Sequence, residues 1–268
     1  MIQVNGIMNG IVSLAWDTEY HSFAGLTIIY EGDSLPVKPG DPVEAMWGEP
    51  GGLLTLRGYT AWRVRKEYRS QLVAHEFAGS WHQKTQRLLP GPRSSAIRIL
   101  LDQNGEHPGE NVVKGGDIEY SQNESDIAML YRLAGVNPIW RNDQGDVCIC
   151  PPPGAEIGRG EVIDLKPTNI EPKKYVVSGF SPEGRGFEVK LGEGPEIRVS
   201  NVFHSPGEAR EYLELLANSE PKAVLRMIGR PEVRAGSKLK LYNGTEWKVT
   251  RCRHEVVHNA WTITAYLR

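Results

Sequence analysis

Residues 36–43 read Pro-Val-Lys-Pro-Gly-Asp-Pro-Val, and far along the chain residues 231–237 read Pro-Glu-Val-Arg-Ala-Gly-Ser. Both stretches have the proline and glycine content of a turn, and each precedes an alternating segment that is typical of a strand. The same elements then follow in both blocks: a hairpin, an arginine-containing strand (62–65 and 249–253) and an alternating last strand (72–77 and 261–266). The sequence therefore predicts one duplication of a small antiparallel β unit, with a chance likeness between two β-meanders as the alternative.

The composition is that of a chain with an ordinary core and many turns. Of the 268 residues 40% are hydrophobic, and 29 glycines and 18 prolines favour short β elements. No apolar run approaches the length that crosses a bilayer, and the first residues lack the pattern of a secretory signal. The 31 basic and 33 acidic residues give a net charge of −2, which excludes a globally basic nucleic-acid binder but leaves local patches open. Three cysteines without an easy bridge favour folding in a reducing cytoplasm.

The clearest helical pattern lies near residue 130. Apolar residues recur there at helical spacing, at Ile127, Leu130, Tyr131 and Ala134. Asn123 is the expected N-cap, and Gly135 suits a left-handed residue that ends the helix. Asp126 lies in the first turn, where we expect its charge to contribute about 0.3–1 kcal/mol through capping and the helix dipole. The apolar face should pack on a neighbouring sheet.

Two further helices and two hairpins complete the expected elements. Residues 94–101 are helix formers with Ser94 as a candidate cap. Residues 205–208 combine an N-cap serine, a proline at the first helical position and a glutamate at the third. Residues 139–150 and the Asn-Gly pair at 243–244 both predict hairpins.

Together these elements indicate a mainly β chain with an α/β insert. We expect two similar small antiparallel β-barrels of the tube type and a helix-containing middle domain. The expected domains are residues 1–88 for the first barrel, 89–165 for the α/β middle domain, and 166–268 for the second barrel with one helix.

Three stretches carry a resemblance to a known family. They are the turn at residues 38–43; the helix at residues 124–134, followed by Trp140 and the hairpin residues 144–146; and the last block, with residues 229–231, 235–236, 247–249, His254 and the Thr262 strand. In these stretches the chain resembles the baseplate hub proteins of contractile phage tails, the late-control-D family. That family is related to the hub part of type VI secretion spike proteins.

The resemblance implies a structural protein and not an enzyme. It implies a homotrimeric hub that joins the hexameric tail tube to the trimeric central spike and lines the passage for DNA ejection. The implied partners are further copies of the chain, the tail tube protein, the central spike protein, and a baseplate wedge or other baseplate proteins. DNA would only pass through the lumen, no membrane span is implied, and no catalytic, cofactor-binding or metal-binding residue is expected.

The same resemblance implies a location in the particle and a symmetry of the assembly. The place would be the baseplate of a virion or tailocin tail, assembled in the host cytoplasm and used for host cell entry. Two β units in each of three chains would give a ring that resembles a six-fold one, and the duplication is the sequence feature that this symmetry requires.

Cysteine and histidine residues raise a metal site as an alternative. Cys148 and Cys150 share one face of a strand, as Cys252 and His254 do, and the four could build a zinc-type site. The C-x-C spacing is not the usual one for zinc, and the two pairs fall in different expected domains. We therefore expect small, half-buried strand residues.

A metal-dependent peptidase is the runner-up hypothesis. Residues 254–258 read His-Glu-Val-Val-His, in which Glu255 would be the general base between the ligands His254 and His258. The motif acts on a helix, whereas its neighbours here are β-like. On a strand the two histidines would lie about 13 Å apart, too far for one ion. A monomeric β-rich ligand-binding module is a third hypothesis.

One basic cluster remains. Arg63, Arg65, Lys66 and Arg69 are interleaved with the aromatic residues Tyr59, Trp62 and Tyr68. Such a pattern is compatible with a nucleic-acid surface. The charged outer face of a barrel strand, or a subunit interface, is the interpretation that we favour.

Overall fold

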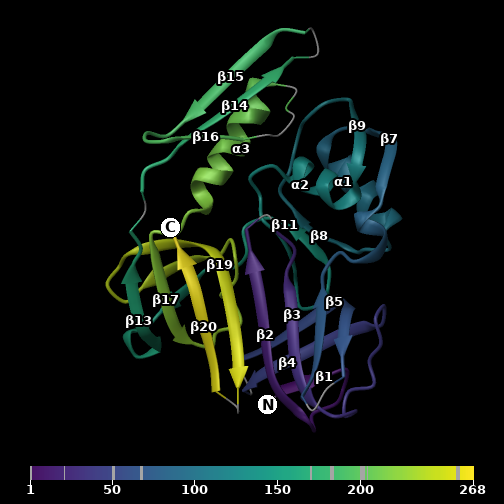
Figure 1. Ribbon diagram of the computed structural model, residues 1–268, viewed down its shortest axis with the longest axis vertical. Coiled ribbons are helices and arrows are strands. Elements are labelled where there is room, and N and C mark those ends of the chain that lie inside the picture. The colour runs from purple at the N-terminus through teal and green to yellow at the C-terminus, as the bar shows by residue number, and fades with distance from the viewer. Residues whose placement is uncertain are drawn as a thin grey trace.

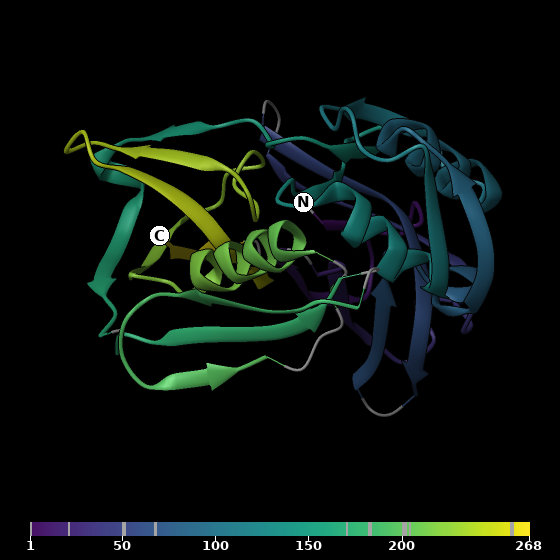
Figure 2. The same cartoon turned by 90° about the horizontal axis from the view of Figure 1, so that it is seen from above.

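The computed structural model describes residues 2–20, 22–49, 52–66, 69–169, 171–181, 184–199, 203, 205–257 and 260–268. A 12-stranded sheet forms its base, and two smaller units lie at one end of this sheet (Figure 1). Seen from above, the middle unit lies on the side of the N-terminal strands and the outer unit on the side of the C-terminal strands (Figure 2). The expected mainly β fold with antiparallel sheets is confirmed.

The N-terminal half of the sheet is the first β unit. Its strands are β1 (Ile2–Val4), β2 (Ile11–Glu19), β3 (Gly25–Glu31), β4 (Pro42–Glu49), β5 (Gly52–Arg65) and β6 (Arg69–His75). They pair antiparallel in the order β1-β4-β5-β6-β3-β2. Alternation along β3 buries Leu26, Ile28 and Tyr30 completely, and these residues pack with Trp47 in one core.

The C-terminal half of the sheet is the second β unit. Its elements are β12 (Ala155–Ile157), η2 (Arg159–Glu161), β13 (Val162–Pro167), β17 (Ala223–Ile228), β18 (Lys238–Leu241), β19 (Glu246–Val257) and β20 (Ala260–Leu267). The strands pair in the order β12-β18-β19-β20-β17-β13. Leu225, Met227 and Ile263 belong to a separate core.

The two β units are copies of one topology. When the six strands of each unit are ranked along the chain, both units pair in the order 1-4-5-6-3-2. One difference is the direction of the first strand, because β1 runs antiparallel to β4 whereas β12 runs parallel to β18. A chance likeness between meanders does not reproduce a non-sequential strand order, so the predicted duplication is supported.

The turn that precedes the fourth strand of each β unit makes the same three hydrogen bonds in both units. In the first copy, Gly40 N donates to Ala61 O (2.8 Å), Ala61 N donates to Asp41 O (2.9 Å), and Lys38 N donates to Asp41 Oδ2 (2.8 Å).

In the second copy, Gly236 N donates to Val249 O (2.8 Å), Val249 N donates to Ser237 O (2.9 Å), and Arg234 N donates to Ser237 Oγ (3.2 Å). Both glycines have a positive φ, +95° at Gly40 and +91° at Gly236, which favours glycine at this place in the turn. Residues 38–41 and 234–237 are therefore equivalent.

The last strands of the two copies align differently in the structure from the alignment that the sequence suggested. Ala61 pairs with Ala74, and the equivalent Val249 pairs with Leu267, so Ala74 corresponds to Leu267 and not to Ile263. The difference arises because the second hairpin continues for four more pairs, to Val257 and Ala260, before it turns.

The middle unit packs around two helices. Its elements are η1 (Gly79–His82), β7 (Lys84–Pro90), α1 (Arg93–Gln103), β8 (Pro108–Asn111), β9 (Glu119–Ser125), α2 (Asp126–Ala134), β10 (Ile139–Arg141) and β11 (Val147–Ile149). β7 pairs with β9, and β10, β11 and β8 form a three-stranded sheet. The predicted hairpin of residues 139–150 is β10 and β11.

The predicted helix near residue 130 is α2, but its cap differs. Ile127, Leu130 and Ala134 are buried as expected, and Met129 and Leu133 are buried too, so the apolar face is wider than predicted. The N-cap is Ser125, whose hydroxyl accepts from Ala128 N (3.4 Å), and not Asn123. Asn123 remains in β9, because that strand pairs with β7 up to Ser125. Gly135 has φ +60° and ψ −126°, which is outside the left-handed helical region.

Asp126 lies in the first turn as expected, but it also makes contacts beyond the capping and helix-dipole role that we expected. Its Oδ1 accepts from Arg87 Nη2 and Gln122 Nε2, both at 2.7 Å, and its Oδ2 accepts from Asn104 Nδ2 at 2.8 Å. Only 6% of the residue is exposed. Asp126 therefore joins α2 to β7, α1 and β9, which a local sequence pattern does not reveal.

The other two helices differ in how they begin. α1 starts one residue before Ser94 and has Pro92 as its N-cap, with no side-chain cap bond. α3 (Pro206–Ser219) begins as predicted, with Ser205 Oγ accepting from Glu208 N at 3.1 Å.

The outer unit is a short helix-covered sheet. It consists of β14 (Lys174–Phe180), β15 (Gly186–Leu191) and β16 (Glu196–Arg198), which α3 covers. Val177 and Leu213 form its small core. No helix in the described part of the chain is long and apolar enough to span a membrane.

The expected domain boundaries at residues 88 and 165 do not coincide with these groupings. Phe77 and Trp81 already belong to the core of the middle unit. β12 and most of β13 precede residue 165 but pair with strands of the second β unit. Residues 174–219 then form the outer unit, an insertion between β13 and β17.

Candidate assembly site

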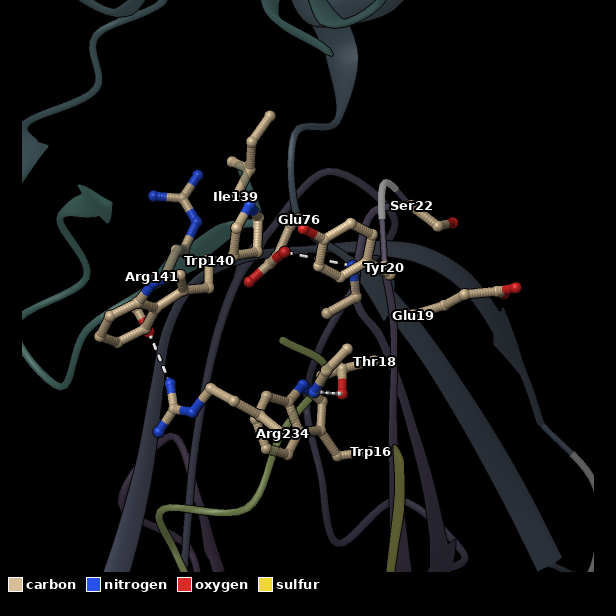
Figure 3. Close-up of a pocket in the computed structure, with 13 residues that line it drawn as sticks. Trp16, Thr18, Glu19, Tyr20, Ser22, Glu76, Ile139, Trp140, Arg141 and Arg234 are labelled. Atoms are coloured by element: carbon tan, nitrogen blue, oxygen red, sulfur yellow. Dashed lines mark hydrogen bonds between the residues drawn. The ribbon is translucent and has the colours of Figure 1, made fainter. Parts of the chain in front are cut away.

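Strands β2 and β19 join the two β units into one sheet. Seven residue pairs, from Glu19 with Arg251 to Ser13 with Val257, form this antiparallel joint. The turn of the second copy and strand β10 of the middle unit close over one end of it (Figure 3). Three units of the chain therefore meet at one place, which the sequence did not single out.

His254 lies at the centre of the joint and is completely buried. The centre of its ring lies 4.8 Å from the ring centre of Trp16 and 5.7 Å from that of Trp261. Nε2 lies 2.6 Å from Val233 O, and Nδ1 accepts from Trp261 Nε1 at 3.2 Å. A neutral ring satisfies both bonds, with the proton on Nε2. Burial lowers the pKa of His254 to about 3.

Arg234 from the turn of the second copy extends over the joint (Figure 3). Its Nη1 donates to Arg141 O at 2.9 Å and its Nη2 donates to Pro231 O at 3.2 Å. The guanidinium carbon lies 4.9 Å from the ring centre of Trp140 and 5.6 Å from that of Trp16. Burial lowers the pKa of Arg234. The residue connects the second β unit to the middle unit and to the first β unit at once.

A buried chain of hydrogen bonds runs from Trp16 through the first β unit to Glu76. Trp16 Nε1 donates to Tyr59 OH (2.8 Å), which donates to Glu76 Oε1 (3.0 Å). Glu76 Oε2 accepts from Ala24 N at 3.1 Å. Burial, and then the carboxylate of Glu76, raise the pKa of Tyr59 well above its usual value. Tyr59 is thus a core residue, and not part of the exposed aromatic and basic cluster that we expected.

Arg141 of β10 is held inside the middle unit and lies close against β5. Its Nη1 and Nη2 both bond to the carboxylate of Glu106, each at 2.7 Å. A Cβ placed on Gly58 would lie 2.7 Å from this guanidinium, so the close approach requires glycine in β5. Burial lowers the pKa of Arg141, but the bonds to Glu106 and the charge of Glu76 outweigh it and raise the pKa.

The space enclosed at this meeting point is small. It has a volume of about 20 Å³, room for one water molecule and not for a substrate. The site therefore has the geometry of a joint between units, because Arg234 bonds across to the middle unit and Glu76 is held by Tyr59 OH and Ala24 N.

The candidate metal ligands do not come together. Cys148 and Cys150 lie in and just after β11, whereas Cys252 and His254 lie in β19, and all three cysteines are buried free thiols. Burial raises the pKa of Cys150 to about 11 and also raises that of Cys252. No group of three or more potential ligands occurs within the described ranges.

The geometry also argues against the peptidase hypothesis. His254 and Glu255 lie on a strand, so their side chains point to opposite faces. Both ring nitrogens of His254 are bonded within the protein, and Glu255 accepts from Arg253 Nε at 3.0 Å. His258, the other expected ligand, lies outside the described residues.

The basic cluster lies at an edge of the first β unit. Trp62, Arg63, Arg65 and Lys66 are exposed along the end of β5, and Arg69 is exposed at the start of β6. Lys66 pairs with Asp33 at 2.7 Å. Tyr68 lies outside the described residues. The surface is thus a strand edge with an exposed tryptophan.

Several solved protein structures are similar to this chain along nearly its whole length. Among solved structures, the tail protein from Neisseria meningitidis MC58 superposes with a TM-score of 0.66 at 12% identity, covering 99% of this chain and 94% of that one. The 43 kDa tail protein of prophage MuSo2 from Shewanella oneidensis gives 0.63 at 12% identity, covering 100% and 96%. The chain has the fold of phage tail proteins.

A third similar structure comes from a secretion machine. An E. coli component of the type VI secretion system, itself structurally similar to the T4 bacteriophage tail proteins gp27 and gp5, gives a TM-score of 0.60 at 12% identity. The alignment covers 100% of this chain and 77% of that one. No protein-family model and no curated protein sequence matches.

Proposed function

We propose that this chain is a structural hub of a tail baseplate, in a phage, a tailocin or a related secretion machine. Three copies would join the hexameric tail tube to the trimeric central spike and surround the passage for DNA. The expected partners are the tail tube protein, the spike protein, and a wedge or other baseplate protein.

The internal duplication is the observation that carries this proposal. Each chain holds two β units with one strand order and one turn geometry, joined into a single sheet. Three such chains present six equivalent units, which can meet a six-fold tube on one side while the trimer meets a three-fold spike on the other. Full-length likeness to solved tail proteins adds to this support.

The nature of the joint agrees with a mechanical role. Arg234 of the second β unit donates to Arg141 O of the middle unit, and the space enclosed beside them has a volume of only about 20 Å³.

The test is the copy number and the symmetry of the assembly. Native mass spectrometry of the chain with its spike partner should give three copies of this chain. Electron microscopy of the particle should show them between tube and spike. One copy per assembled particle would refute the proposal; a monomer in dilute solution would not, because association depends on concentration and on the partner.

A further inference from the structure

We propose that the end of β5, with Trp62, Arg63 and Arg65, is a docking site for an extended acidic segment of a partner protein. The segment would carry two acidic residues with one residue between them. Because it names the chemistry of a protein partner, this inference rests on the function proposed above. Its own support is the second β unit, in which the equivalent pair of arginines already faces such a segment.

The ends of β5 and β19 are equivalent residue by residue. Ala61 and Val249 make the same two hydrogen bonds to their turns. Directly after each of these residues, the pairing with the following strand shifts by one residue. The residues that correspond are therefore Trp62 with Thr250, Arg63 with Arg251, and Arg65 with Arg253.

In the second unit the arginine pair faces an acidic segment of β2. Glu19 lies directly opposite Arg251 in the register, and Asp17 lies directly opposite Arg253. Asp17 Oδ2 accepts from Arg253 Nη1 at 2.8 Å, and Asp17 Oδ1 lies 4.0 Å from Arg251 Nη2. Positions i and i+2 of a strand lie about 6.7 Å apart on one face. Two acidic residues at this spacing thus face two arginines at the same spacing.

In the first unit the equivalent pair lacks this neighbour. Arg63 and Arg65 are exposed, and none of the described residues places a carboxylate within 4.0 Å of their side-chain nitrogens. Glu67, the counterpart of Glu255, lies outside the described residues. The contrast between the units therefore rests on the acidic neighbouring strand, because no described strand takes the place of β2 beside the end of β5.

Trp62 adds an apolar contact beside the two charges. Its counterpart Thr250 is 4% exposed and accepts from Tyr20 N at 2.8 Å, directly after the acidic residues of β2. Trp62 is 63% exposed, and its ring centre lies 6.2 Å from that of His75 on β6. Exposed ion pairs contribute little by themselves, whereas tryptophan and arginine are the usual anchors of protein interfaces. The three side chains together form such an anchor.

The chemistry favours an acidic protein segment over a nucleic acid. Within the chain, the equivalent arginines meet the carboxylate of Asp17. Nucleic acids bind through a longer row of phosphate contacts, and Lys66 at this strand end is already paired with Asp33 at 2.7 Å. A second copy is also less suitable, because its acidic strand β2 is already paired with its own β19.

The first test is peptide binding to the full chain. The probe is a fluorescein-labelled peptide in which aspartate and glutamate alternate with threonine. Its control carries asparagine and glutamine at the acidic positions. In fluorescence anisotropy at low ionic strength, the acidic peptide should bind at least about tenfold more tightly, because only its carboxylates pair with both arginines. Equal binding of the two peptides would overturn the proposal.

Variants of the chain locate this binding. Arg63→Gln with Arg65→Gln should lower the affinity for the acidic peptide about tenfold, and so should Trp62→Ala. Arg98→Gln with Arg210→Gln removes the same charge from exposed sites on α1 and α3, and should change the affinity less than about twofold. Circular dichroism checks the fold of each variant. Equal losses in the two double variants would rule out this site.

A labelled oligothymidylate of the same length tests the nucleic-acid alternative. It should bind more weakly than the acidic peptide and should be insensitive to Trp62→Ala. Tighter binding that is lost in the Arg63 and Arg65 double variant would assign the surface to nucleic acid and contradict the proposal.

The second test identifies the neighbour in the assembled particle. A photoreactive benzoylphenylalanine in place of Trp62 should cross-link to a protein other than this chain, at a peptide with two acidic residues one position apart. Cross-linking only to another copy, only to nucleic acid, or to nothing would refute this docking site, while three copies per particle would still support the hub. A single copy per particle would refute the hub and leave the peptide results unchanged.

Discussion

The substitution Asp126→Ala should destabilise the middle unit by about 3 kcal/mol, because it breaks a buried ion pair. Alanine removes the acceptor of three hydrogen bonds, from Arg87, Gln122 and Asn104. Gln122 is completely buried, so its amide would lose a partner that water cannot replace. Arg87 is 22% exposed and can regain some hydration, which places the cost at the lower end of the range for such pairs.

The matched control lies in the same unit. Asp102→Ala on α1 removes an exposed partner of Arg98 at 3.9 Å and should cost less than about 0.5 kcal/mol. A helix-dipole role for Asp126 alone would cost about 0.3–1 kcal/mol, so the two interpretations differ by a measurable amount.

The assay is urea unfolding of the full chain, followed by circular dichroism and by hydrogen exchange in the peptides that contain α2. Hydrogen exchange is needed because the units need not unfold together. Equal losses of stability for Asp126→Ala and Asp102→Ala would refute the buried network as a source of stability.

Leu130→Asp should cost several kcal/mol, because Leu130 is fully buried and the new carboxylate has no partner; a chain with unchanged protection in α2 would contradict this packing. His254 has a pKa of about 3 against an ordinary 6.5, so between these pH values the unfolded chain binds a proton that the folded chain does not. The free energy of unfolding should therefore fall as the pH drops through this range, by up to about 1.4 kcal/mol per pH unit. In unfolding experiments between pH 7 and pH 4, the variant His254→Gln should lack this contribution to the pH dependence. Gly236→Ala should destabilise more than Gly40→Ala in thermal unfolding, because both strain a positive φ but only the former meets neighbours, at 3.0 Å; equal losses would show that the packing at Gly236 adds nothing.

Much of the fold could be predicted from the sequence because the signals are local. The Pro-Gly turn at residues 36–43 and its counterpart at 231–237 carry their own backbone chemistry, and they introduce units with the same strand order. Ser205 caps α3 through a bond to a residue three positions away, so a short window of sequence sufficed to find it.

The candidate site could not be predicted in the same way. Its contacts join residues such as Trp16 and Tyr59, or Arg234 and Arg141, which lie 43 and 93 positions apart. Tyr59 was grouped with the basic cluster because Arg63 and Arg65 follow it on the same strand, whereas its side chain is buried in the core. No periodicity distinguishes a strand that will join another unit from one that will remain an edge.

The sequence by itself determined that one β unit is used twice, because repeated turn chemistry is encoded residue by residue. Only the tertiary structure decided that β2 of the first copy occupies the edge of β19 in the second, whereas no strand among the described residues pairs with the end of β5 or with the outer edge of β13. Backbone groups at a strand edge are alike whatever the side chains, so occupancy of an edge depends on where the rest of the chain runs. Trp62 and Thr250 are equivalent, because each follows one of the matching residues Ala61 and Val249 where the strand pairing shifts by one residue. The same dependence buries Thr250 and exposes Trp62.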